Sequence, residues 1–271
     1  MTTPGYVLGH SERELGRLGT QARLVDPMTR HFFHAAGIVP GMRVLDVGSG
    51  AGHVAFLAAE MVGDDGEIVG VDRAPAALAA ARARAESCSV RRVTFLEGDP
   101  AEMAFDRPFD AVIGRYVLMF QNDPSAMLRK LAAHVRPGGT IVFHEPDWDG
   151  ARSFPQAPTY DRCCRWIVET LRVLGNETRM GKKLHATFLA AGLPAPSMGL
   201  EALIGGGAKG AEGLTLIADL VETMLPAMER ARVATADEAD LESLAARMIH
   251  EAVSNGSVIV GRYEIGAWCC V

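Results

Sequence analysis

The 271-residue sequence has few cysteines, and they do not stand in a pattern typical of a metal site or a disulfide framework. There are five of them, which is an odd number, and they include no C-x-x-C pair. Structural zinc sites need closely spaced ligands, and small disulfide-rich domains usually carry an even set of cysteines. We therefore expect reduced, packed cysteines and no bound metal ion.

The sequence also lacks a long apolar run, a basic cluster and the layout of a signal peptide. No stretch of about 18 apolar residues appears, which argues against a membrane-spanning helix. The net charge is -6, whereas nucleic-acid-binding domains usually present a basic face. The N-terminal residues MTTPGYVLGHSERELGRLG do not follow a charged segment with an apolar one. These absences predict a cytoplasmic protein that does not bind nucleic acid.

Short segments rich in Val and Ile alternate with helical patterns through the first half of the chain. Apolar residues make up 48% of the sequence, which is enough for a substantial core. The expected strands are 43–47, 67–71, 93–97, 109–114 and 140–144, and the expected helices between them are 53–62, 74–86 and 123–135. This alternation predicts a doubly wound, parallel α/β sheet with helices on both faces. Such sheets bind ligands beyond the carboxyl ends of their strands.

The remaining segments predict more helix than strand. Helices are expected at 11–38, 158–174 and 180–191, with two more within 211–253, and strands at 198–203 and 257–268. Gly205, Gly206 and Gly207 predict a flexible break. We expect a single domain over 1–271, with an N-terminal helical lid (1–38), a ligand-binding core (40–150), a helical cap (151–256) and a C-terminal strand (257–271).

The stretch VLDVGSGAGH at residues 44–53 predicts a buried strand, a glycine turn and the start of a helix. Its spacing is G-x-G-x-G, with His53 where the dinucleotide fingerprint G-x-G-x-x-G places its third glycine. A pyrophosphate cradle therefore fits the turn less well. Asp46 precedes the first glycine by two residues, which favours a ligand that carries an amine or a cationic centre.

Five segments in order resemble the class I S-adenosylmethionine-dependent methyltransferases, in particular the small-molecule branch that includes quinone-biosynthesis enzymes. They are VLDVGSGAGHVA, VGVDRAPAALAAAR, FLEGDPAEMAF, FDAVIGRYVLMF and VRPGGTIVFHEPDW, within residues 40–148. The resemblance implies a Rossmann-like, doubly wound, mostly parallel seven-stranded sheet whose last strand is antiparallel. It also implies a helical substrate-covering insertion and S-adenosyl-L-methionine as the cofactor.

The resemblance assigns cofactor roles to the strand ends. Asp46 helps to hold the methionine amine, Asp72 binds the ribose hydroxyls and Asp99 binds the adenine amino group. The full expected set is Asp46, Gly48, Ser49, Gly50, Gly52, Asp72, Arg73, Asp99, Pro100, Ala101, Gly114 and Arg115. Pro100 departs from the family because it has no N–H to offer the adenine ring. Either Ala101 supplies that donor, or water does.

The sequence identifies the residues that contact the methyl acceptor less specifically than those that bind the cofactor. His144 and Glu145 are the candidate catalytic residues, because His144 has a near-neutral pKa by type and both lie at the end of an expected strand. His144 could equally be a hydrogen-bonded core histidine. The candidate substrate-binding residues are Tyr6, His10, Tyr116, Trp148, Tyr160 and Met224. The Met-rich composition of 151–256 indicates either an ordinary helical core or an adaptable apolar pocket.

The predicted function is methyl transfer to a small hydrophobic or aromatic metabolite, at an O, N or C atom. The alternatives are an NAD(P)-dependent oxidoreductase of Rossmann architecture and a non-catalytic relative that binds the cofactor. The sequence leaves the oligomeric state open, with a homodimer as one option.

Overall fold

The structure is a computed structural model that describes residues 12–87 and 92–271. The chain divides into two compact units that interleave along the sequence. We call Val25–Glu145, Gly181–Gly199 and Ile265–Val271 the sheet unit, and Met1–Leu24, Pro146–Met180 and Leu200–Glu264 the helical unit. The expected subdivision into lid, core, cap and final strand stays a prediction.

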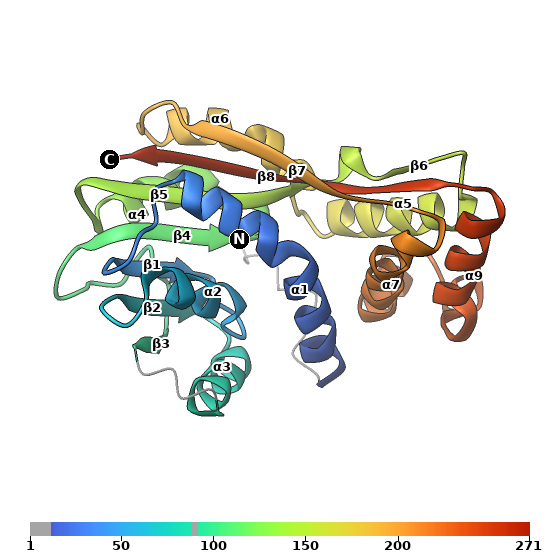
Figure 1. Cartoon of the computed structure of the whole chain (residues 1–271), viewed down its shortest axis with the longest axis horizontal. Helices are drawn as coiled ribbons and strands as arrows, with labels where there is room; N and C mark the ends of the chain where they lie inside the picture. The colour runs from blue at the N-terminus through green and yellow to red at the C-terminus, as the bar shows by residue number, and fades with distance from the viewer. Residues whose placement is uncertain (1–11, 88–91) are drawn as a thin grey trace. The chain divides into compact units, whose positions relative to one another are not determined.

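Parallel strands form most of the sheet, in the order β3-β2-β1-β4-β5 (Figure 1). Their bounds are β1 (Arg43–Val47), β2 (Glu67–Asp72), β3 (Val93–Glu97), β4 (Phe109–Arg115) and β5 (Val135–Asp147). Next to β5 lies β8 (Val258–Cys270). The Gly138 N–H donates to the Val271 carbonyl at 2.7 Å, so the end of β8 lies beside the start of β5. β8 therefore runs antiparallel to β5, as the resemblance implied.

The described residues form eight strands in this sheet, where the resemblance implied seven. The additional strands beside β8 are β6 (Arg152–Phe154), which pairs with it antiparallel, and β7 (Ser197–Gly206). β6 was not predicted, because three residues are too few to show an alternating pattern.

Helices pack on the strands of the sheet unit and close its core. They are α2 (His53–Val62), α3 (Pro75–Ser87), α4 (Pro124–Ala132), α6 (Met180–Ala190) and the second half of α1 (Glu12–Ala35), with the short turn η1 (Leu118–Phe120). α2 buries Val54, Phe56 and Leu57 against strand residues such as Ile68 and Ile113. This packing follows from the apolar run that the strand–turn–helix pattern predicted.

The helical unit contains four helices among the described residues: α5 (Pro158–Val173), α7 (Ala211–Ala231), α8 (Ala236–Ala239) and α9 (Leu241–Ser254). In Figure 1, α5, α7 and α9 lie on one side of the strand pair β6–β8. Of two short turns, η2 (Trp148–Gly150) lies between β5 and β6, and η3 (Gly207–Gly210) lies between β7 and α7.

The secondary structure of two glycine-rich stretches differs from the prediction. β5 begins at Val135, because Val135 pairs with Phe109 before the register shifts. Gly139 stands at that irregularity, where a Cβ would lie 2.5 Å from the Val135 side chain. Gly205 is part of β7 rather than a flexible break. A Cβ there would lie 2.8 Å from Gly210, so close packing requires the glycine.

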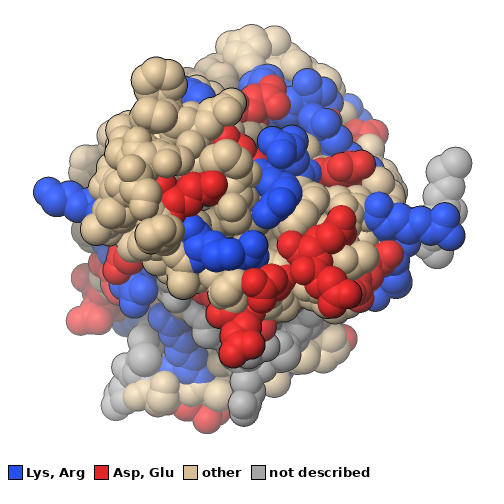
Figure 2. All heavy atoms as spheres, turned by 90° about the vertical axis from the view of Figure 1, so that its right-hand side faces the viewer, with Lys and Arg blue, Asp and Glu red and all other residues tan. Residues whose placement is uncertain are grey.

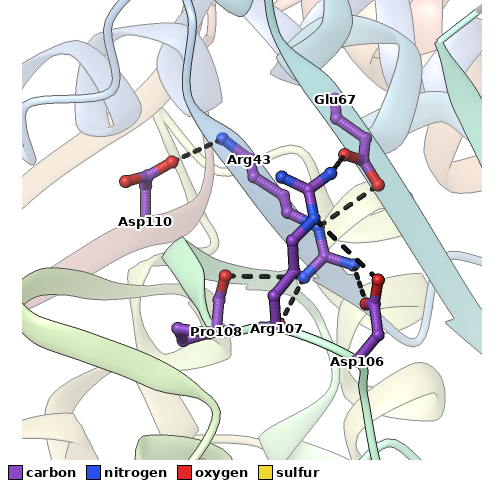
Figure 3. A network of polar contacts seen from close by, with 6 residues as sticks. All are labelled: Arg43, Glu67, Asp106, Arg107, Pro108 and Asp110. Atoms are coloured by element: carbon purple, nitrogen blue, oxygen red, sulfur yellow. Dashed lines mark hydrogen bonds and ion pairs between the residues drawn. The ribbon is translucent and has the colours of Figure 1, made fainter.

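Charged side chains connect the amino-terminal ends of the strands (Figure 3). Arg43 on β1 donates to Glu67 at 3.2 Å and to Asp106 at 3.0 Å, and its backbone N–H donates to Asp110 at 2.7 Å. The Arg43 guanidinium also lies 4.2 Å from the centre of the Phe109 ring. These contacts stabilise the sheet edge opposite the carboxyl ends of the strands.

Candidate functional site

The glycine turn joins β1 to α2, and its three glycines adopt a left-handed backbone. The φ angles of Gly48, Gly50 and Gly52 are +65°, +51° and +83°, values that other residues rarely take. A Cβ at Gly48 would lie 2.8 Å from Val117, and one at Gly52 would lie 2.9 Å from Phe56. The turn therefore needs glycine both for its backbone and for its packing.

The N-terminus of α2 follows the turn directly and has no side-chain cap. Gly52 is the N-cap residue, and the first turn of the helix contains no acidic residue. The first N–H groups of a helix have no partner within it, and they carry the positive end of the helix dipole. The start of α2 thus presents N–H donors and partial positive charge, which suits a carboxylate.

Asp46 lies near the end of β1, and its carboxylate is buried without a partner. The residue is 1% exposed, and neither carboxylate oxygen has a hydrogen-bond partner among the described residues. Burial raises the pKa of Asp46 to about 8; the Arg115 guanidinium opposes this rise and Asp72 adds to it. The buried Ser49 hydroxyl is likewise unpaired. Unpaired buried groups are costly, so Asp46 and Ser49 mark a place for a polar ligand.

Asp72 ends β2, and backbone hydrogen bonds hold its carboxylate against the glycine turn. One oxygen accepts the Gly50 N–H at 2.8 Å, and the other accepts the Ala74 N–H at 2.8 Å. The Ser49 N–H donates to the Val71 carbonyl at 3.1 Å. The structure thus brings Asp72 and the turn together, as the strand-end positions predicted. The contact of Asp72 with a ribose stays a prediction.

Asp99 follows β3, and both of its oxygens are engaged within the protein. One accepts the Ala101 N–H at 3.0 Å, and the other pairs with the Arg73 guanidinium. The Pro100 carbonyl accepts a hydrogen bond from Nε2 of His134 at 3.1 Å. The Ala101 N–H thus already has a partner in the protein, and the choice between Ala101 and water as the donor to an adenine ring stays a prediction.

His53 begins α2 and stays neutral near pH 7. Burial, together with the positive charges of Arg84 and Arg115, lowers the pKa of His53 to about 4. The Arg84 guanidinium lies 2.6 Å from Nδ1 of His53. Since arginine can only donate, the neutral imidazole nitrogen accepts this bond.

Arg115 ends β4, and its buried guanidinium contacts α1. Nη1 lies 2.7 Å from the Asp26 carboxylate and 2.9 Å from the Thr29 hydroxyl, and the side chain is 5% exposed. Gly114 has no space for a side chain, because a Cβ would lie 2.5 Å from Phe143. The Arg115 side chain is thus used within the protein, and the backbone of 114–115 is the part predicted to contact a cofactor. Sequence reasoning missed Asp26 and Thr29, which carry no local motif.

His144 on β5 is fully buried within the sheet unit. Its Nδ1 lies 3.1 Å from the Thr29 hydroxyl, and its ring packs edge-on against Phe32 and Tyr116 at 5.0 and 5.4 Å between centroids. Its exposed fraction is 0%. This environment is that of a hydrogen-bonded core histidine, and a catalytic role for His144 stays a prediction.

Glu145 caps the η1 turn that follows β4. Its carboxylate accepts the N–H groups of Val117 at 2.8 Å, Leu118 at 2.7 Å and Met119 at 3.3 Å. The side chain is fully buried. These contacts give Glu145 a clear structural role, and its catalytic role stays a prediction.

Replacing Glu145 by Gln should lower the free energy of unfolding by about 2–4 kcal/mol, because charge-assisted hydrogen bonds are lost in a buried site. Urea unfolding measures this loss. Glu102→Gln is the control, since the Glu102 carboxylate is 62% exposed in its ion pair with Lys130 and should contribute less than about 1 kcal/mol. Equal stability of the Glu145→Gln variant and the unsubstituted protein would contradict the capping role.

The residues expected on the acceptor side fall in different environments. Tyr116 has a left-handed φ of +57°, a strained conformation that is common at functional sites. Trp148 is buried, and its ring centre lies 5.1 Å from the Arg262 guanidinium. Tyr160 and Met224 are both 1% exposed in the core of the helical unit, so their substrate contacts stay predictions. Tyr6 and His10 lie outside the described residues.

Two features are absent from the described residues: a cluster of metal ligands and a membrane-spanning helix. No group of three or more His, Cys, Asp or Glu side chains within residues 12–87 and 92–271 could hold a metal ion. No helix in the same ranges is long and apolar enough to cross a bilayer. On the face drawn in Figure 2, basic and acidic side chains are interspersed with uncharged ones.

The sequence matches a known family model and several known proteins. A family model described as a methyltransferase domain matches residues 38–189. Aklanonic acid methyltransferase of Streptomyces sp. (strain C5) is 36% identical over 143 residues, which are 52% of this chain and 64% of that protein. A 2-phytyl-1,4-naphtoquinone methyltransferase of Synechococcus elongatus is 35% identical over 134 residues, 48% of this chain and 56% of that protein. The chain thus spans less than two thirds of the length of these relatives.

A solved structure agrees on the fold. A putative methyltransferase from Bacillus halodurans C-125 has a TM-score of 0.55 at 18% identity, covering 89% of this chain and 96% of its own. The matched family region spans more than half of the sequence and contains the glycine turn, Asp72, Asp99 and β5. The chain therefore belongs to the methyltransferase-domain family.

Proposed function

We propose that this protein transfers a methyl group from S-adenosyl-L-methionine to a small hydrophobic or aromatic metabolite. The observation that carries the proposal is the unpaired, buried carboxylate of Asp46 beside a left-handed glycine turn. A cationic amine satisfies such a carboxylate, whereas the phosphates of a nicotinamide dinucleotide would be repelled by it. Family membership likewise gives no support to the oxidoreductase alternative.

The residues present fit this cofactor. Asp46 would hold the amine, and the uncapped N-terminus of α2 would bind the carboxylate of the same amino acid. Asp72, already oriented by the Gly50 and Ala74 N–H groups, would accept the ribose hydroxyls. Asp99 would accept a hydrogen bond from the adenine amino group once the Arg73 guanidinium moves away from the Asp99 carboxylate.

Bound S-adenosyl-L-methionine supplies an electrophilic methyl group on a positively charged sulfur. The work of the chain is then to position the two reactants and to exclude water. The glycine turn holds the donor side, because its backbone can approach a ligand where a Cβ would intrude. A general base is needed only where the acceptor atom carries a proton, and His144 and Glu145 are the candidates by position.

The name of one relative supports an aromatic acceptor, whereas two others are named arsenite methyltransferases. The Streptomyces protein is named for aklanonic acid and the Synechococcus protein for a phytyl naphthoquinone. Because these matches cover about half of this chain, they support S-adenosyl-L-methionine as the methyl donor more strongly than they support any particular methyl acceptor.

Calorimetry with S-adenosylmethionine and S-adenosylhomocysteine tests the proposal, with NADH as the control ligand. We expect micromolar binding of both sulfur compounds and none of NADH. Methyl transfer to any member of an aromatic acceptor panel separates an enzyme from a non-catalytic relative. Absence of binding of both sulfur compounds would refute the proposal.

A further inference from the structure

The guanidinium of Arg115 is a buried positive charge of the sheet unit, and a carboxylate of α1 neutralises it. Nη1 of Arg115 lies 2.7 Å from the Asp26 carboxylate and 2.9 Å from the Thr29 hydroxyl. The Arg115 side chain is 5% exposed, whereas the Asp26 side chain is 30% exposed. Arginine is not deprotonated in proteins, and a neutral hydroxyl cannot balance its charge. Asp26 is therefore the group that holds this cation in place.

A second carboxylate, that of Asp46, lies on the same face of the sheet as Arg115, one strand away. β1 pairs with β4 so that Asp46 stands opposite Ile113, and Arg115 follows Ile113 by two residues along β4. Side chains two positions apart on a strand point to the same face. Diagonal neighbours of this kind lie about 7–8 Å apart, within the reach of a long side chain. Rotation of the Arg115 side chain can therefore bring its guanidinium to Asp46.

We propose that Asp26 is a positioning residue for cofactor binding: it holds the Arg115 guanidinium on α1 and so keeps the Asp46 carboxylate free for the cationic amine of the cofactor. This inference rests on the proposed function and adds to it a residue that acts only through Arg115. The guanidinium and the amine would compete for one carboxylate. Neither oxygen of Asp46 has a hydrogen-bond partner among the described residues, which is the arrangement that leaves room for the amine.

The other charged and titratable groups around this carboxylate leave the position of Arg115 to the ion pair on α1. Burial raises the pKa of Asp46 to about 8, the positive charge of Arg115 opposes that rise, and Asp72 adds to it. The Asp72 carboxylate already accepts two backbone N–H groups. His53 is neutral near pH 7, because its pKa is about 4. His144 contacts the same threonine hydroxyl as the guanidinium, at 3.1 Å.

A double-mutant cycle on the full chain tests the inference, with calorimetric titration of S-adenosylhomocysteine as the measurement. Asp26→Ala should weaken binding by about 10-fold, because Arg115 then occupies Asp46 in roughly nine of ten molecules. In the Arg115→Met background, the same substitution should change the affinity by less than about twofold, since the competing cation is gone. A loss of equal size in both backgrounds would overturn the inference, and so would no loss in either.

Glu60→Ala is the matched control, because Glu60 on α2 forms an ion pair with Arg30 and so also links α1 to the rest of the sheet unit. That pair is exposed, and its loss should change the affinity by less than about twofold. If urea unfolding shows that Asp26→Ala is not folded, Asp26→Asn takes its place, since the amide keeps an acceptor for Arg115 without the charge. Weakening of the same size by Glu60→Ala would assign the effect to a loosened helix and overturn the inference.

Proton release gives a second readout, which a loosened helix alone would not change. In the unsubstituted protein Asp46 is largely protonated near pH 7, and it should lose its proton when the cationic ligand binds. In Asp26→Ala the charge of Arg115 should already keep Asp46 ionised, so binding should release no proton from it. Undiminished proton release by Asp26→Ala would overturn the inference. The proposed function fails by a different result, the absence of S-adenosylhomocysteine binding to the unsubstituted protein.

Discussion

Replacing Gly50 by alanine should reduce the affinity for S-adenosylhomocysteine by about 100-fold, which corresponds to about 3 kcal/mol. Gly50 has a φ of +51°, and nothing lies within 4 Å of the position of a Cβ. The methyl group therefore disturbs no protein contact, but it enters the open space beside the turn where the cofactor would lie. Calorimetric titration measures the loss.

Gly63→Ala is the control for backbone strain. Gly63 ends α2 with a φ of +66° and also has nothing within 4 Å of its Cβ position. Gly63 has a ψ of -167°, a backbone region essentially restricted to glycine, so Gly63→Ala should lower the melting temperature at least as much as Gly50→Ala. Only Gly50→Ala should lose affinity, and equal affinities of the two variants would show that the turn does not contact the cofactor.

Replacing Asp46 by Asn should also reduce affinity by about 100-fold, because a buried carboxylate then no longer faces the cationic amine. The ligand-free variant should be more stable than the unsubstituted protein near neutral pH, since the amide has no charge to desolvate. A carboxylate that is 1% exposed with no hydrogen-bond partner among the described residues is the physical reason for both effects.

The pH dependence of stability separates Asp46 from other carboxylates. The pKa of Asp46 rises from 3.8 to about 8 on folding, so between these values the folded chain holds a proton that the unfolded chain has lost. The stabilising contribution is complete below about pH 4 and is lost as the pH rises through 8. Between pH 4 and pH 8 the free energy of unfolding should fall by up to roughly 1.4 kcal/mol per pH unit because of Asp46. The Asp46→Asn variant should lack this part of the pH dependence.

Cofactor binding should reverse the ionisation of Asp46. A bound cation favours the charged carboxylate, so binding at pH 7 should release a proton, which calorimetry detects as a dependence of the measured heat on the buffer. Asp46→Asn should release none. Identical proton release from both proteins would contradict the assignment of Asp46 to the amine.

The sequence predicted the parts of the fold that have local causes. β1 and β3 match the predicted 43–47 and 93–97, because short apolar segments bounded by turn residues have few other interpretations. The left-handed angles of Gly48, Gly50 and Gly52 also have a local origin, since only glycine takes them without strain. Asp72 was predicted at the turn because adjacent parallel strands end at one edge.

The parts that were missed depend on contacts between distant segments. Arg115 pairs with Asp26, which is 89 positions away, and Glu145 accepts from the 117–119 backbone across 26–28 positions. The periodicity of the sequence does not predict contacts between residues so far apart.

A crystal structure of the complex with S-adenosylhomocysteine is the most direct test of the cofactor site. We predict that its amine binds the Asp46 carboxylate, that its carboxylate lies at the N-terminus of α2, and that its ribose hydroxyls bind Asp72. Electron density for the ligand elsewhere, with the Asp46 carboxylate still buried and unpaired, would contradict the proposed site.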